Sequence, residues 1–295
     1  MQTPVRLAVV AVGLGAVFAA AVGVGAAVGP IGAVPEAHTA APAPPSADAG
    51  TGYVLDVLEE QPAAGTTTVE FRVLGPDGAP VTTYTEDHGE DLHLVAVRAD
   101  LSGYQHVHPD LGPDGTWRAP LTLTPGSWRL VADTTPAASA EDAVGEGLAL
   151  TGDLQVAGAY DPQPLPEPSA VTEFDGYTVV LTGDLTPGGE SELTFSVSRD
   201  GRPVNDLQPY LGAYGHLVAL REGDLEYLHV HPVEDDAVAP APGPHVEFAA
   251  TAPSTGTYRL FLDFRHGDAV YTAAFTVPTT GSAAPDESAE HGHDD

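Results

Sequence analysis

Short apolar runs separated by Gly, Pro and Asp turns follow one another along the chain after about residue 50. Within runs such as 67–74 and 192–197, apolar and polar residues alternate singly, which is the period of a half-buried strand. No segment after Val28 has a convincing helical period. The pattern therefore predicts an all-β fold. Its strands are expected near 53–58, 67–74, 92–98, 117–123, 128–133, 177–182, 192–197, 216–221, 226–231, 246–250, 257–264 and 269–277.

The second half of this pattern repeats the first. HLVAVR at 93–98 matches HLVALR at 216–221, and YQHVHP at 104–109 matches YLHVHP at 227–232, both with an offset of 123 residues. We predict two tandem Ig-like or cupredoxin-like antiparallel β-sandwich modules, at 51–158 and 172–278. A Pro-rich linker over 159–171 would join them, and an acidic disordered tail would occupy 279–295.

The N-terminus carries an uncharged apolar run over 7–28, preceded by Arg6. Its 22 residues suit a membrane-spanning helix, whereas its Gly content and the small residues at 37–43 also suit a cleaved signal peptide. Positive charge stays in the cytoplasm, so both readings export the rest of the chain. We expect a hydrophobic helix within 1–29, as signal peptide or membrane anchor. A Pro/Ala-rich tether over 30–50 and an extracytoplasmic body would follow it.

Composition narrows the possible partners and chemistry. Hydrophobic residues make up 42%, a globular content, and the formal net charge is -32, so nucleic acid and anionic lipid are disfavoured as partners. Cysteine is absent and the single methionine is residue 1. These absences exclude disulfides, cysteine nucleophiles and thiolate sites, and they argue against a thioether site for Cu(I).

Each module carries one copy of a His-x12-His-x-His pattern. The two sets are His93, His106, His108 and His216, His229, His231. A hairpin would pair the outer histidines of each set and place the middle one on the same strand face, at the end of a half-buried apolar face. Three imidazoles would then surround one ion. We predict one Cu(II) or Zn(II) site per module, with Asp133 and Asp263 as fourth ligands or as acceptors for imidazole N–H groups.

Other readings of the histidines remain open. The modules could be an adhesion or scaffold protein in which the histidines satisfy hydrogen bonds, or the clusters could be charged near pH 6 and act as a pH-sensitive element. A metal hydrolase would need a general base, for which only Asp133 or Asp263 is a candidate, so we expect a non-enzyme. The unmatched histidines, His88, His245 and His266, are interpreted as surface residues.

The strings HLVALR at 216–221, LHVHP at 228–232 and TYRLFLD at 257–263 resemble a family of uncharacterised bacterial secreted or membrane-anchored proteins associated with heavy-metal, chiefly copper, handling. The resemblance covers most of 51–278. It implies a β-sandwich, bound copper and a metal-transport partner protein. The tripeptide at 106–108 also resembles the copper-ligand strand of copper/zinc superoxide dismutases, but the cysteine pair, zinc-loop histidines and lid of that enzyme have no counterpart here.

Overall fold

The structure is a computed structural model that describes residues 51–137, 147–228, 230–233 and 241–281. All of these described residues belong to one compact unit. Throughout the described ranges the regular structure is strand, which confirms the all-β prediction. The predicted N-terminal helix, the whole of the predicted tether and most of the acidic tail lie outside them. Within these ranges, no helix has the length and apolar character needed to cross a membrane.

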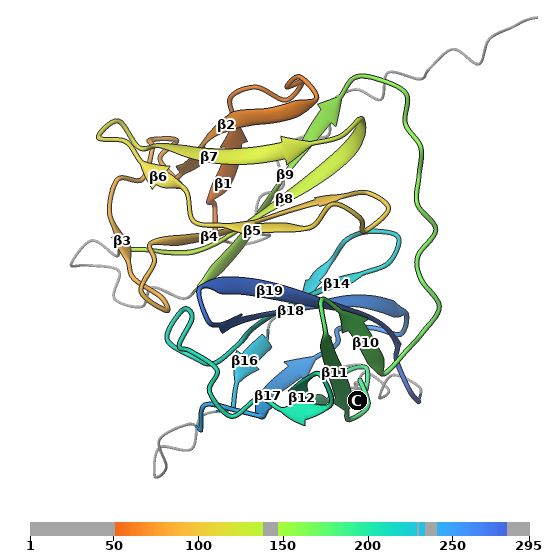
Figure 1. The fold of residues 1–295 in the computed structure, drawn as a ribbon. Coiled ribbons are helices and arrows are strands. Elements are labelled where there is room, and N and C mark those ends of the chain that lie inside the picture. The colour runs from red at the N-terminus through yellow and green to blue at the C-terminus, as the bar shows by residue number, and fades with distance from the viewer. Residues whose placement is uncertain (1–50, 138–146, 229, 234–240, 282–295) are drawn as a thin grey trace, which may run out of the picture. The chain divides into compact units, whose positions relative to one another are not determined.

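The first half consists of two antiparallel sheets (Figure 1). One sheet has the order β1 (Val54–Val57), β2 (Gly65–Leu74), β7 (Thr116–Leu123), β6 (Asp110–Leu111). The other has the order β3 (Tyr84–Thr85), β8 (Gly126–Pro136), β4 (Leu92–Arg98), β5 (Gln105–Val107), and β9 (Leu148–Val156) also pairs with β8.

The second half has the same arrangement. One sheet has the order β10 (Val171–Phe174), β11 (Tyr177–Thr182), β12 (Glu190–Arg199), β17 (His245–Thr251), β16 (Val230–Pro232), with β13 (Arg202–Pro203) beside β12. The other has the order β15 (Tyr227–Leu228), β14 (His216–Arg221), β18 (Thr257–His266), β19 (Ala269–Pro278). The order β15-β14-β18-β19 repeats β5-β4-β8-β9, and β11-β12-β17-β16 repeats β1-β2-β7-β6. The internal sequence repeat is therefore a repeat of strand order.

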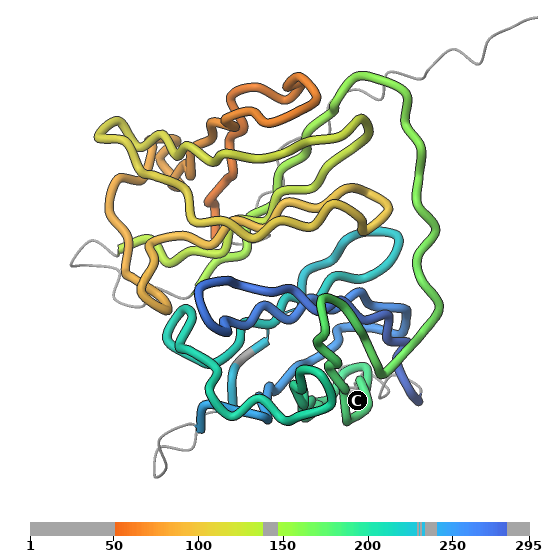
Figure 2. Tube along the Cα trace, viewed as in Figure 1, coloured from red at the N-terminus to blue at the C-terminus, as the bar shows by residue number. Residues whose placement is uncertain are grey.

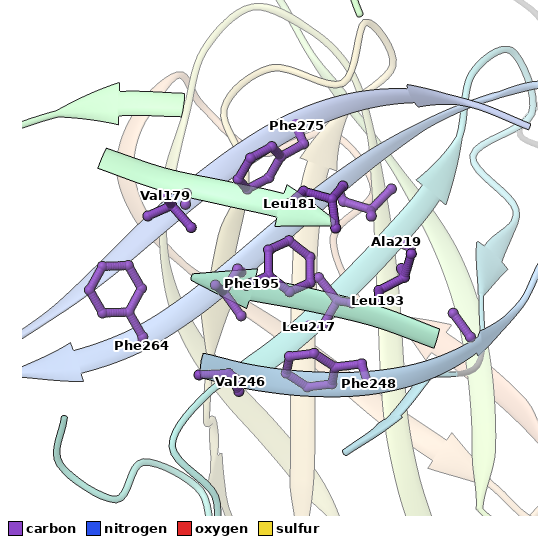
Figure 3. Close-up of a cluster of buried hydrophobic side chains, with 14 of the residues drawn as sticks. Val179, Leu181, Leu193, Phe195, Leu217, Ala219, Val246, Phe248, Phe264 and Phe275 are labelled. Carbon is purple, nitrogen blue, oxygen red and sulfur yellow. The ribbon is translucent and has the colours of Figure 1, made fainter. Parts of the chain in front are cut away.

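Each half has its own hydrophobic core, formed where the alternating apolar residues of its two sheets face each other. Trp117 and Trp128 are fully buried in the first core, as their strand positions predict. Phe195 and Phe248 lie in the second core (Figure 3). A strand-free stretch over 157–170 connects β9 to β10 (Figure 2). The two cores make each half a separately packed sandwich.

A third cluster of apolar side chains joins the two halves. It contains Val95 and Val97 from β4 and Val218 and Leu220 from β14, all at most 3% exposed. These residues alternate with the core residues of their strands, so both faces of β4 and β14 are covered. The sequence predicts that this histidine-bearing face is half-buried within its own module. The structure corrects that expectation, because the matching apolar faces of the two halves cover each other.

The predicted single strand over 226–231 is divided between two sheets, which is a second correction. β15 pairs with β14, whereas β16 pairs with β17 and sets His231 opposite Ala249. The chain crosses here because Val230 packs against the second core. The predicted ladder pairing of His216 with His231 is therefore absent. The first half crosses in the same way between β5 and β6.

Candidate metal centre

Three histidines of the first half gather beside the end of β4. His93 lies on β4, His106 lies on β5 opposite Val95, and His108 follows the last residue of β5. Each of the three offers a ring nitrogen that lies within 4.8 Å of the other two. Their ring centroids are 5.0 to 5.5 Å apart. The first predicted trio thus converges on one point of the structure.

The outer hydrogen bond of His93 determines its tautomer. Its Nε2 lies 3.1 Å from the backbone carbonyl oxygen of Asp87. A carbonyl oxygen can only accept, so Nε2 carries the hydrogen and donates it, and Nδ1 keeps its lone pair. This Nδ1 lies 3.3 Å from Nε2 of His106.

The outer nitrogen of His106 donates its hydrogen bond to a carboxylate in the other half of the chain. Its Nδ1 lies 3.0 Å from Oδ2 of Asp263 on β18, a carboxylate that is 2% exposed. Asp263 also accepts hydrogen bonds from the hydroxyls of Tyr104 at 3.0 Å and Thr272 at 2.5 Å. A carboxylate with three donors accepts from each of them, so Nδ1 of His106 carries the hydrogen. Its Nε2 therefore presents a lone pair to His93.

Two lone pairs consequently face each other across 3.3 Å, between Nδ1 of His93 and Nε2 of His106. No hydrogen bond can form between two acceptors, so this contact is repulsive unless a cation lies beside both nitrogens. Nitrogens bound at 2.0–2.1 Å to one tetrahedral ion are about 3.3 Å apart. Nε2 of His108 is also buried, and it has no hydrogen-bond partner in the described part of the chain. The donor set therefore suits a metal ion.

Burial lowers the pKa of two of these imidazoles, His93 and His108, so that both are neutral at pH 7. Burial, together with the neighbouring His106, lowers the pKa of His93 to about 4. Burial and the charges of His106 and His93 lower the pKa of His108 to about 4 as well. Neutral imidazoles are the form that binds a metal, so protons compete weakly for these nitrogens at pH 7.

A histidine of the second half joins the same cluster. The ring centroid of His216 lies 4.6 Å from that of His106 and 5.3 Å from that of His93. Burial, followed by the charges of the neighbouring histidines, lowers the pKa of His216 well below its ordinary value. His88, expected on the surface, is half-buried with its ring 6.3 Å from both His93 and His216. The sequence pattern predicts neither the approach of His216 to this cluster nor that of His88.

The rest of the second predicted trio is not placed by the structure, because His229 and the side chain of His231 lie outside the described residues. A site within the second module stays a prediction.

The two predicted aspartates occupy equivalent positions that face opposite halves. Tyr104 of the first half donates to Asp263, and Tyr227 of the second half donates to Asp133, both at 3.0 Å. Asp263 lies opposite His216 in the β14–β18 ladder, and Asp133 lies opposite His93 in the β4–β8 ladder. Asp263 thus accepts an imidazole N–H from the partner half. The matching apolar faces of the two repeats, Val95 with Val97 and Val218 with Leu220, are the sequence signal for this exchange.

The lowered pKa values predict acid sensitivity of the protein in chelator. A histidine whose pKa is about 4 when folded and near 6.5 when unfolded favours folding fully above pH 6.5, and this contribution is lost as the pH falls toward 4. For His93 or His108 titrating alone, the loss at pH 5 is about 2 kcal/mol. We expect urea unfolding in EDTA at pH 7.5 and pH 5 to show this loss.

Replacing His108 by leucine isolates the effect from the many carboxylates that also titrate. The variant should lose less stability between pH 7.5 and pH 5 than the native chain does, by about 2 kcal/mol. An identical pH dependence in the two proteins would show that His108 is not held neutral by the fold.

The fold and the site together define a tandem antiparallel β-sandwich protein with a buried histidine cluster where its two halves meet. The family model described as "Domain of unknown function (DUF8832)" matches residues 47–143 and 171–281. The chain belongs to this family. Membership of a family without an assigned function agrees with part of the predicted resemblance, whereas its secreted or membrane-anchored character and its association with copper stay predictions. A comparison with curated proteins gives no match.

Solved structures with some similarity are β-rich proteins of bacteria. A DUF4426 family protein from Pseudomonas aeruginosa PAO1 is 12% identical, with a TM-score of 0.26, covering 37% of this chain and 95% of that one. Invasin, a bacterial integrin-binding protein, is 14% identical (TM-score 0.23), covering 78% of this chain and 40% of that one. Domains 4 and 5 of the S-layer protein SbsC are 9% identical (TM-score 0.22), covering 81% and 100%.

Proposed function

We propose that the protein is an extracytoplasmic metal-binding protein that holds Cu(II) or Zn(II) through His93, His106 and His108. The observation that carries the proposal is the pair of facing lone pairs, 3.3 Å apart, on Nδ1 of His93 and Nε2 of His106. The buried, unpartnered Nε2 of His108 supplies the third donor.

The same observation disfavours a purely structural role for the cluster. Structural histidines are retained in a buried site because their ring nitrogens are satisfied by hydrogen bonds. Here the outer nitrogens of His93 and His106 are satisfied and their inner nitrogens oppose each other. A divalent ion converts the repulsion between the inner nitrogens into two coordinate bonds.

Ligand chemistry limits the proposed ion to Zn(II) or Cu(II). The chain has no cysteine, and its single methionine is residue 1, so soft ligands for Cu(I) are absent from the sequence. Imidazole suits both Zn(II) and Cu(II), and the general affinity order places Cu(II) above Zn(II). The resemblance to copper-handling proteins favours copper among the two.

Binding rather than catalysis is the proposed activity. The carboxylate nearest the trio, Asp263, already accepts hydrogen bonds from Tyr104, His106 and Thr272. It is thus an orienting acceptor for His106 and is poorly placed to deprotonate a metal-bound water. We infer a role in metal buffering, resistance or delivery to a metal-transport partner protein, outside the cytoplasmic membrane.

Metal titration of the full chain, kept in mild detergent and stripped with EDTA, tests this function. We expect calorimetry with a competing chelator to detect a tight site for Zn(II) and for Cu(II). The triple variant His93→Ala, His106→Ala, His108→Ala should lose one tightly bound ion. An ion that survives the triple substitution would be held by other ligands of the chain, such as His229 and His231 of the second predicted set.

The single variant His108→Ala guards against misfolding, because His108 lies at the edge of the cluster with its side chain 20% exposed. The matched control is His245→Ala, which removes an exposed imidazole of β17 that contacts Ser196. The control should bind metal as the native chain does. Equal affinity in the native chain, the triple variant and His108→Ala would refute the proposed function.

A further inference from the structure

His216 occupies a position in the cluster that the metal-binding trio alone does not explain. It belongs to β14 in the second half, yet its ring stacks on His93 at 5.3 Å with an interplanar angle of 14°. The ring also lies 4.6 Å from that of His106. A neutral imidazole is thus buried beside the metal-binding nitrogens of the other half.

The ring spacing agrees with a shared ion. An imidazole centroid lies about 1.1 Å beyond its coordinating nitrogen, so rings on one tetrahedral ion have centroids about 5 Å apart. Five ring pairs among the four histidines have centroid separations between 4.6 and 5.5 Å. The ring nitrogens of His93, His106 and His108 lie within 4.8 Å of one another, and His216 approaches this group through its contacts with His93 and His106.

The backbone of the second half supports His216 at this place. His216 lies opposite Asp263 in the β14–β18 ladder, and Asp263 holds Nδ1 of His106 at 3.0 Å. A single pair of neighbouring strands therefore supplies both the acceptor that orients one ligand of the first half and an imidazole beside it. The stacked rings of Tyr104 from the first half and Phe261 on β18, with centroids 4.0 Å apart, hold β18 against the first half.

His88 is the other histidine near the cluster, and it is less well placed. Its ring is 6.3 Å from those of His93 and His216, which exceeds the spacing of the other pairs. Its side chain is 30% exposed and its Nε2 lies 3.7 Å from a carboxylate oxygen of Asp87. These features match a residue at the solvent edge of the site.

We propose that His216 is the fourth ligand of the ion, so that one metal joins the two halves of the chain and occupancy is coupled to their docking. This inference rests on the proposed function of the trio. Between the halves, the ion adds coordinate bonds to the apolar cluster and the two tyrosine–aspartate hydrogen bonds. Binding or release of the ion then changes how firmly β14 is held against β4 and β5.

The first test counts the imidazoles on the metal. The variant His216→Phe keeps an aromatic ring stacked on His93 and removes both nitrogens. Pulsed electron paramagnetic resonance of the Cu(II)-loaded full chain should detect four coordinated imidazoles, and three in His216→Phe. The affinity for Zn(II) should fall by about 100-fold, because one of four ligands is lost. His245→Ala should match the native chain in both measurements.

The second test follows the docking of the halves. Hydrogen–deuterium exchange of the native chain should slow in β4, β5 and β14 when Zn(II) is added. In His216→Phe, saturating Zn(II) should still slow exchange in β4 and β5, whereas β14 should exchange as in EDTA. This difference separates a bridging ligand from a residue that only packs, because packing alone would not depend on metal.

The outcomes distinguish this inference from the proposed function. If the trio variants bind metal as the native chain does, the proposed function fails and the bridge fails with it. If the trio is required but His216→Phe gives the same imidazole count, affinity and β14 protection as the native chain, only the bridging role is overturned. His216→Ala provides a second variant should the larger phenylalanine ring disturb folding.

Discussion

Replacing Val218 by aspartate is expected to separate the two halves of the protein while each half stays folded. Val218 is fully buried in the apolar cluster between the halves, which has eight buried residues. A buried carboxylate with no partner costs several kcal/mol. The cores of the halves contain 18 and 22 buried residues, and Val218 is in neither. The cost of burying the carboxylate therefore destabilises the interface between the halves rather than either core.

Small-angle scattering and limited proteolysis measure this separation. The variant should have a larger radius of gyration than the native chain, and its connection over 157–170 should be cut faster by protease. Far-ultraviolet circular dichroism should remain that of a β protein. Affinity for Zn(II) should also fall, because His106 loses its contact with Asp263 when the halves part.

The control is Val180→Asp, which places the same charge on an exposed position of β11. Val180 and Val218 both lie on strands of the second half, so the pair differs in burial rather than in residue type or module. The control should scatter as the native chain does. Compact scattering from Val218→Asp would mean that the interface tolerates the charge and is weaker than its burial indicates.

Local pattern was sufficient to predict most of the longer strands of this fold, but not β9, which pairs with β8, nor β10. The alternation within 67–74 and 192–197 corresponds to β2 and β12, whose buried positions also alternate. Such alternation indicates a strand with one buried face and one solvent-exposed face, and it can be recognised without knowing which strand pairs with it. The repeat at an offset of 123 residues likewise predicted the repeated strand order.

The interface between the halves could not be predicted from local pattern. β4 is buried at all seven positions, so its run of apolar residues is compatible with a strand between two layers of one sandwich or between two sandwiches. The sequence does contain an indication of the interface, because two matching apolar faces in one chain can exclude water by packing against each other. A pattern confined to one module does not reveal that the two faces pack against each other.

The candidate site shows the same division between local and distant information. The convergence of His93, His106 and His108 follows from the spacing of the histidines on adjacent strands. The contributions of Asp263 and His216 depend on residues more than 100 positions away, across an interface that spacing does not reveal. The sequence could therefore predict the three histidine ligands, but not the contact by which Asp263 orients His106.

Exchanging Asp263 for asparagine is expected to weaken both the metal site and the joint between the halves. The carboxylate accepts hydrogen bonds from Tyr104, His106 and Thr272, and a neutral amide cannot replace all three with charge-assisted bonds. The loss of a buried charged acceptor should cost about 1.5–3 kcal/mol of unfolding free energy. Loss of the group that orients a histidine ligand should weaken Zn(II) binding by about 10–100-fold.

Asp133→Asn is the internal control for Asp263→Asn, because Asp133 occupies the equivalent place in the repeat and accepts the hydroxyl of Tyr227. Both variants remove a carboxylate from between the halves, so chemical denaturation in EDTA should show a loss of stability in each. Zn(II) affinity at the described cluster should fall only in Asp263→Asn, since Asp263 alone of the two contacts His106. Equal losses of affinity would mean that both aspartates act through docking of the halves and that orientation of His106 contributes little.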